Sequence, residues 1–131
     1  MIIRRQYALA GTDREVSPEN GNWVSRRLLL HSDGMDFSLH DTVIHAGTTT
    51  FMWYKHHVEA VYCVGGEGEL EDLETGEVHQ ITDGTMYALN SNERHRLSAR
   101  TDMRMVCVFS PPLTGQEVHD EEGVYPLIHT T

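Results

Sequence analysis

Three side chains from separate parts of the chain, Glu59, Tyr87 and His95, have the chemistry to hold one metal ion. A carboxylate, a phenol and an imidazole form a hard-to-intermediate ligand set, which suits iron or another first-row divalent ion. A phenol ligates well only when a metal lowers its pKa, so tyrosine is a less common ligand than histidine. The same residues also fit a strand-end acid, a core aromatic ring and a loop histidine. Residue type and spacing alone leave both interpretations open.

Short runs of alternating apolar and polar residues must position these side chains. We expect strands over 22–30, 37–45, 59–64, 78–81, 85–89, 94–99 and 104–110, an extended stretch over 51–58 and an edge strand over 1–9. Loops or turns fill 10–21, 31–36 and 46–50, and 70–78 has the pattern of two strand ends around a Gly-containing turn. Many short strands without a helical period predict an all-β antiparallel sandwich or barrel.

The period-2 alternation assigns side chains to common faces. The groups expected to share a face are Trp23, Ser25, Arg27 and Leu29; His40, Thr42 and Ile44; Glu59, Val61 and Cys63; Thr85, Tyr87 and Leu89; and Cys107 with Phe109. Such faces fit the inward-pointing positions of a barrel. An arginine on one of them favours a binding role over a plain core face, because a buried charge needs a partner.

Composition limits the class of protein. The 131 residues suffice for one domain, 1–131, with a real core. Acidic residues outnumber basic ones 20 to 10 and the formal net charge is -10, so we expect no nucleic acid and no anionic membrane as a partner. The sequence has neither a long apolar span nor a signal-peptide core, which predicts a cytoplasmic protein. Cys63 and Cys107 stand in apolar runs and are expected to be buried free thiols.

The end of the chain differs from the strand-rich part. Residues 112–131 contain Gly115, Gly123 and Pro126, and Pro111 and Pro112 end regular strand pairing before them. We expect this stretch to be a covering segment that can act as a lid over the barrel.

Two motifs resemble those of cupins, a superfamily of small β-barrels. Residues 59–66 have the spacing of the first cupin motif, a Glu followed after six residues by a Gly. Residues 84–95 have the Gly-to-His spacing of the second motif, with Asn90 where Pro is usual and Asn92 where Gly is usual.

The two-histidine part of the first cupin motif is missing, because residues 53–55 are Trp, Tyr and Lys. The resemblance therefore supplies only two ligands, Glu59 and His95. Tyr87 can supply the third.

More specifically, the chain resembles the ectoine synthase family of cupins from about residue 22 to residue 127. The blocks that carry this resemblance are 21–23, 25–30, 53–55, 59–63, 66–69, 71–77, 101–104, 106–109, 111–115, 117–120 and 123–127. The resemblance implies a single-domain cupin barrel, a jelly-roll-like β-sandwich that forms a homodimer. It also implies an Fe²⁺-dependent hydro-lyase that cyclises N4-acetyl-L-2,4-diaminobutyrate to ectoine, a compatible solute that protects cells from osmotic stress.

The resemblance also implies roles for particular residues. The metal ligands are Glu59, Tyr87 and His95; the acid-base groups are Tyr54, Glu117 and His119, which the sequence does not rank; and the substrate contacts are Trp23, Arg27, His40, Thr42, Cys107 and Phe109. His40 stands where some relatives are expected to have Asn. The other histidines, His31, His45, His56, His57, His79 and His129, are expected not to be ligands.

Two alternatives to this function remain open. One is another cupin enzyme, such as a sugar isomerase or a dioxygenase, although a dioxygenase would usually show more histidine ligands. The other is a non-catalytic cupin that binds or senses a small molecule. Such a module would need neither the acid-base residues nor an open metal position.

Overall fold

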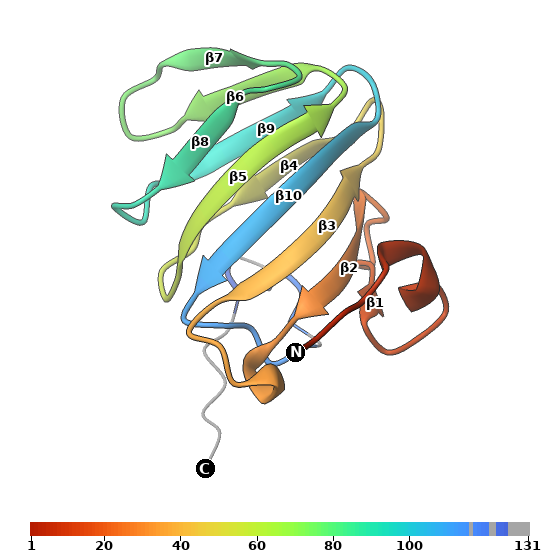
Figure 1. The fold of residues 1–131 in the computed structure, drawn as a ribbon. Helices are drawn as coiled ribbons and strands as arrows, with labels where there is room; N and C mark the ends of the chain where they lie inside the picture. Colours follow the sequence, from red (N-terminus) through yellow and green to blue (C-terminus); the bar gives the residue numbers. More distant parts are fainter. Residues whose placement is uncertain (116, 121–122, 126–131) are drawn as a thin grey trace.

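Two antiparallel β-sheets face each other in the computed structural model, which describes residues 1–115, 117–120 and 123–125 (Figure 1). The first sheet has the strand order β1 (Glu15–Val16), β2 (Trp23–Leu29), β3 (Ser38–Ile44), β10 (Met103–Ser110), β5 (Val58–Gly65) and β8 (Met86–Leu89). The second has the order β4 (Thr49–Met52), β9 (His95–Ala99), β6 (Gly68–Asp72) and β7 (Val78–Ile81). The predicted all-β antiparallel sandwich is confirmed.

The hydrophobic core lies between the sheets, and alternate residues of the strands fill it. In β5 and β10 every second side chain is buried, which places Glu59, Val61 and Cys63 on the inner face together with Cys107 and Phe109. Both cysteines are buried free thiols, as predicted. Strict alternation is the signature of a sheet with one buried face.

One face assignment is wrong in part. Trp23, Ser25 and Arg27 are buried, but Leu29 is only partly buried. The register between β2 and β3 shifts between Arg27 and Leu29, so an extra residue enters the strand there. Such a bulge reverses the inward and outward positions that follow it, and Leu30 becomes the buried residue.

The predicted edge strand over 1–9 is wrong. The residues Gln6–Leu9 form a short 3-10 helix, η1, whose one buried residue is Leu9. Side-chain contacts, not strand pairing, attach this region: the Arg4 guanidinium donates to the Leu28 carbonyl and to the Asp33 carboxylate.

Other boundaries also differ from the prediction. Strand β4 covers Thr49–Met52, so it begins inside the predicted turn 46–50 and ends well before residue 58. Strand β1 lies in the predicted loop 10–21, and residues His31–Asp33 form a second short 3-10 helix, η2, in the predicted turn 31–36.

The chain after β10 runs back over one end of the barrel. We call its described residues, 112–115, 117–120 and 123–125, the covering segment. Its buried residues include Leu113, Glu117 and Tyr125. The backbone of Leu113 accepts a hydrogen bond from the His31 amide, and Gly123 accepts one from the Trp53 amide. The predicted covering role extends to 131, but residues 126–131 lie outside the described part of the chain. Within the described residues, the chain forms no helix of the length and apolarity that a membrane crossing requires.

Candidate active site and metal centre

A small cavity lies between the two sheets, below the covering segment. Its free space is about 30 Å³, which holds little more than a water molecule. Nine of the twelve side chains predicted for the site line it: Trp23, His40, Thr42, Tyr54, Glu59, Tyr87, Cys107, Phe109 and His119. The remaining lining residues are Ile44, Met52, Val61, Leu97, Met105 and Tyr125. Residues spread over the whole chain therefore gather at one site.

Three predicted site residues do not line this cavity. His95 lies in β9 of the opposite sheet, and its ring centroid is 5.5 Å from that of Tyr54. Arg27 is fully buried behind the cavity wall, and Glu117 is buried in the covering segment. All three are next to lining residues without bordering the free space.

His95 is prepared to act as a ligand. Its Nδ1 lies 3.0 Å from the backbone carbonyl of Glu93. A carbonyl only accepts, so Nδ1 carries the proton and Nε2 keeps its lone pair. Nε2 is buried and has no hydrogen-bond partner among the described residues. Metal-binding histidines usually donate their other ring nitrogen in this way.

Glu59 and Tyr87 come from neighbouring strands, since Glu59 pairs with Leu89 and Val61 with Tyr87 in the β5–β8 ladder. Burial raises the pKa of Glu59 to about 8, so its anionic form lacks a compensating charge in this cavity. Burial, and secondly the charge of Glu59, raise the pKa of Tyr87. A cation would stabilise the ionised form of both groups.

The donor set fits a metal only when Tyr87 is included. Among the described residues, no three His, Cys, Asp or Glu side chains are grouped closely enough to hold a metal ion. Glu59 and His95 therefore need a donor of another kind. Tyr87 borders the same cavity as Glu59, and the set of carboxylate, phenol and imidazole fits a first-row divalent ion.

Tyr54 and His119 form an acid-base pair at the cavity. The Tyr54 hydroxyl lies 3.0 Å from Nε2 of His119. Burial raises the pKa of Tyr54 well above its ordinary value. Burial, followed by the charges of His95 and Arg27, lowers the pKa of His119 to about 3. Tyr54 therefore keeps its proton and shares one hydrogen bond with a neutral imidazole, and the tautomer of His119 decides which of the two groups donates.

Arg27 and Glu117 hold the covering segment. The two terminal nitrogens of Arg27 donate to the backbone carbonyls of Gly115 at 2.8 Å and Glu117 at 2.6 Å. The Glu117 carboxylate accepts the amides of Thr114 and Gly115. Burial alone would raise the pKa of Glu117, but these backbone hydrogen bonds lower it. The carboxylate therefore stays ionised, 4.0 Å from the Arg27 guanidinium.

Sequence reasoning missed three residues near the site. Tyr125 lines the cavity and stacks on both Tyr54 and His119. His57 is buried, and its Nδ1 has no hydrogen-bond partner within the described part of the chain. Asn92 donates from its amide to the carbonyls of Tyr54 and His57. Only Asn92 carried a usable signal, because it replaces the usual Gly of the second cupin motif and has a positive φ of 55°.

The arrangement can bind a small molecule with an electrophilic centre beside a cation. A metal held by three protein groups keeps positions open for substrate. The Tyr54–His119 pair can move a proton at the same cavity. Trp23 and Phe109 supply apolar walls, and the indole nitrogen of Trp23 is a buried donor that has no partner in the part of the chain that the structure describes.

Comparison with known families gives one match over nearly the whole chain. The model of the family described as ectoine synthase matches residues 1–129. The L-ectoine synthase of Desulfatibacillum aliphaticivorans is 55% identical over 128 residues, which is 98% of this chain and 98% of that protein. The L-ectoine synthase of Halalkalibacterium halodurans is 58% identical over 128 residues, again 98% of both chains.

Solved structures agree with these matches. The crystal structure of ectoine synthase from P. lautus superimposes with a TM-score of 0.87 at 56% sequence identity, covering 100% of this chain and 93% of that one. A predicted oxalate decarboxylase from Thermotoga maritima has a TM-score of 0.68 at 18% identity, covering 84% of this chain and 99% of that one. This second likeness concerns the fold alone.

Proposed function

The chain belongs to the ectoine synthase family, and we propose that it performs the family's hydro-lyase reaction in the cavity between the two sheets. The substrate is N4-acetyl-L-2,4-diaminobutyrate and the product is ectoine. The observation that carries this assignment of the site is the gathering of nine predicted residues around one cavity.

The reaction forms one bond and removes one water molecule. The free 2-amino group attacks the carbonyl carbon of the acetamide, a carbon–nitrogen bond closes the ring, and the former carbonyl oxygen leaves as water to give a cyclic amidine. An amide carbonyl is a poor electrophile and needs polarisation. We assign Glu59, Tyr87 and His95 as the groups that hold Fe²⁺, which supplies Lewis acidity when bound.

Tyr54 and His119 handle the protons. The attacking amine must be neutral and lose a proton, and the departing oxygen must gain protons. We assign the neutral imidazole of His119 as the proton acceptor and the Tyr54 hydroxyl, 3.0 Å from it at the same cavity, as the proton donor. The Glu117 carboxylate is engaged by backbone amides, so its part is to hold the covering segment closed.

Substrate recognition falls to the cavity wall. Trp23 and Phe109 enclose the carbon chain, and the partnerless indole N–H of Trp23 meets a substrate oxygen. Thr42 and Cys107 add short polar groups, with His40 beside them. Arg27 attracts the substrate carboxylate. Its terminal nitrogens donate to the covering segment, so it acts on the carboxylate through its positive charge while the segment stays in place.

The covering segment has to move during each cycle. Free space of about 30 Å³ cannot hold a substrate of eleven heavy atoms, which needs on the order of 100 Å³ or more. Opening the segment admits the substrate, and closure excludes water from a reaction that releases water.

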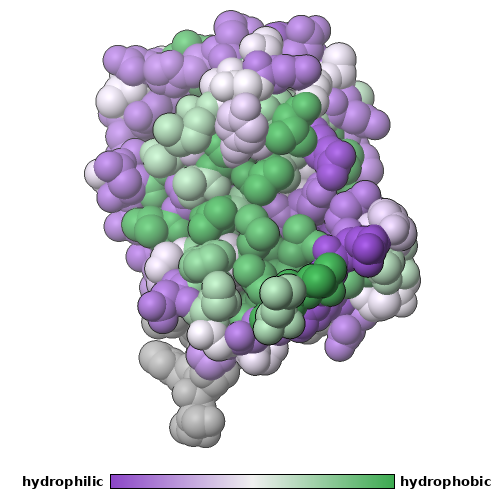
Figure 2. All heavy atoms as spheres, in the orientation of Figure 1, coloured by the Kyte–Doolittle hydropathy of each residue, from purple (hydrophilic) through white to green (hydrophobic). Residues whose placement is uncertain are grey.

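We also propose that the enzyme is a cytoplasmic homodimer that makes ectoine as a protectant against osmotic stress. Support for the dimer comes from the outer face of the six-stranded sheet, where Figure 2 shows a broad apolar area. Val58, Tyr62 and Val64 on β5 and Met86 on β8 are exposed there, between 40% and 60%. Apolar patches of this kind mark protein contacts.

The test is direct. Purified protein is supplied with Fe²⁺ and N4-acetyl-L-2,4-diaminobutyrate, and ectoine is measured by chromatography, with a metal-free sample as control. Ectoine formation that depends on iron supports the proposal. Tight substrate binding without product would favour a sensing cupin, and turnover of an unrelated substrate alone would favour another cupin enzyme.

A further inference from the structure

His40 is bound by a hydroxyl group at each end of its ring. Its Nδ1 lies 3.2 Å from Oγ of Ser25, and its Nε2 lies 2.9 Å from Oγ of Ser38. All three side chains are buried, with 0% to 2% exposure. Burial, followed by the charge of Arg27, lowers the pKa of His40 well below its ordinary value. The ring is therefore neutral, with one donor and one acceptor nitrogen.

The partners of Ser25 decide which nitrogen carries the proton. The Ser25 hydroxyl accepts from Nε of Arg27 at 3.4 Å and from the Thr42 hydroxyl at 3.3 Å. Both of its lone pairs are then used, so its own hydrogen goes to Nδ1 of His40. Nε2 of His40 consequently carries the ring proton and donates it to Ser38.

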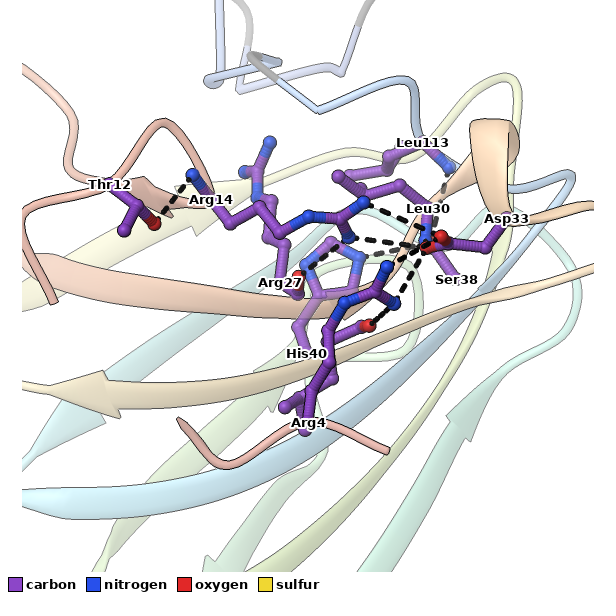
Figure 3. Close-up of polar contacts among 10 residues, drawn as sticks. Arg4, Thr12, Arg14, Arg27, Leu30, Asp33, Ser38, His40 and Leu113 are labelled. Atoms are coloured by element: carbon purple, nitrogen blue, oxygen red, sulfur yellow. Dashed lines mark hydrogen bonds and ion pairs between the residues drawn. The ribbon is translucent and has the colours of Figure 1, made fainter. Parts of the chain in front are cut away.

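The same network reaches the covering segment at two places, and Figure 3 shows the first of them, at Ser38 and Leu113. At one end, the Leu113 amide donates to Oγ of Ser38 at 3.1 Å. At the other, Arg27 donates to the carbonyls of Gly115 and Glu117. Ser25, His40 and Ser38 therefore link Arg27 to the Leu113 amide through hydrogen bonds in the cavity wall. Arg27 also binds the segment directly, so both ends of this chain of hydrogen bonds contact the segment.

We propose that Ser25 and Ser38 are positioning residues that couple the seating of the covering segment to the orientation of His40 and Thr42 in the cavity wall. When the segment lifts, Ser38 loses the Leu113 amide and Arg27 loses two carbonyls. The hydroxyl groups then reorient, and with them the His40 ring and the Thr42 hydroxyl. Closure of the lid and formation of the substrate-binding wall are one event, a role that rests on the proposed function of this cavity.

The sharpest variant is Ser25→Ala, because Ser25 has no hydrogen bond to the described residues of the covering segment. Hydrogen exchange of the Leu113 amide and cleavage by Glu-C protease after Glu117 report the seating of the segment. Both are expected to speed up by about three- to tenfold, the equivalent of one lost hydrogen bond. The nitrogen shifts of the His40 ring, measured by NMR, should change from a single Nε2–H tautomer to exchanging tautomers.

Ser38→Ala removes the other hydroxyl, and Ser110→Ala is its matched control. The Ser110 hydroxyl donates to the Asp36 carbonyl at the exposed end of β10, away from His40 and Leu113. Ser38→Ala should raise the KM for substrate about tenfold with a smaller loss in kcat, and should speed cleavage after Glu117. Ser110→Ala should match the wild type in every measurement.

Hydrogen exchange, proteolysis and NMR do not depend on turnover, so they test the coupling even if the protein does not form ectoine. Wild-type Leu113 exchange, Glu-C cleavage and His40 tautomer in a folded Ser25→Ala protein would overturn the proposal. If Ser25→Ala does not fold, Ser38→Ala takes its place. Wild-type Glu-C cleavage and a wild-type His40 tautomer in folded Ser38→Ala would then overturn the proposal.

Discussion

The Tyr54 hydroxyl lies 3.0 Å from Nε2 of His119, and this hydrogen bond joins the barrel to the covering segment. Tyr54 belongs to the loop between β4 and β5, whereas His119 belongs to the covering segment and lines the cavity from there. Tyr125, from the same segment, stacks on both rings. The pair therefore depends on the position of the covering segment, and under the proposed function this ties proton transfer to exclusion of solvent.

A double-mutant cycle tests this pair. Tyr54→Phe and His119→Asn should each lower kcat by about 10²-fold, since a positioned acid or base contributes about that much. The double variant should lose little more than either single one, because the two residues act as one unit. Losses that multiply would show that the residues act independently.

The covering segment should be sensitive to substitution at Gly123. This glycine has a φ of +76°, and a Cβ there would lie 2.7 Å from the Phe51 carbonyl oxygen. Gly123→Ala should therefore displace the segment and raise KM by about tenfold or more. Gly76→Ala is the control, because Gly76 has a φ of +80° and a Cβ there would meet nothing within 4 Å. It should cost about 1–2 kcal/mol of stability from the positive φ alone, with KM unchanged. Equal kinetics in the two variants would contradict the role of the segment.

Asn92 is expected to position Tyr54. Its side-chain amide donates to the carbonyls of Tyr54 at 2.7 Å and His57 at 3.3 Å. Asn92→Gly keeps the positive φ accessible but removes both hydrogen bonds. The free energy of unfolding should fall by about 1 kcal/mol, and kcat by about tenfold as Tyr54 shifts. Asn90→Gly, in the same loop, is the matched control. Unchanged kcat in Asn92→Gly would remove Asn92 from this role.

The cluster around Asp33 should make stability depend on pH below 4 (Figure 3). Burial alone would raise the pKa of Asp33, but hydrogen bonds from Arg4, the Leu30 amide and Arg14 lower it to about 2. A carboxyl whose pKa is lower in the folded state contributes stability that is present above the unfolded value near 4 and lost as the pH falls through 2. Because both arginines are partly solvent-exposed, we expect a contribution of about 1–2 kcal/mol.

Denaturant unfolding of Asp33→Asn between pH 2 and 6 measures this contribution. The variant should be less stable than the wild type at pH 6, and the gap should close toward pH 2. Asp36→Asn, an exposed neighbour, should show no such gap. A difference that is constant across the range would mean that the ionised Asp33 contributes nothing.

Alternation along the strands was sufficient to predict the sandwich and most inner faces, because one buried side forces a period of two. It did not predict the places where a bulge or a side-chain contact takes the place of regular strand pairing. A bulge turned Leu29 off the inner face, and Arg4 holds the N-terminal region through Asp33 although the apolar residues there suggest a strand.

The sequence was sufficient to predict which residue types form the site, but not which hydrogen bonds join them. Sequence placed Arg27 on an inward face, and the structure shows that its donors bind the covering segment. No sequence pattern pointed to the hydrogen bonds that His40 makes with the hydroxyls of Ser25 and Ser38. Such contacts join residues up to 90 positions apart, and no local rule reports them.

The iron content of His95→Ala tests the central claim most directly, with His79→Ala as the matched control because His79 is exposed. After reconstitution with Fe²⁺ and removal of free metal, the wild type and His79→Ala should each hold about one iron per chain and form ectoine. His95→Ala should remain folded and lose both the bound iron and turnover, because it lacks the one imidazole of the set. Wild-type iron content in His95→Ala would contradict the account.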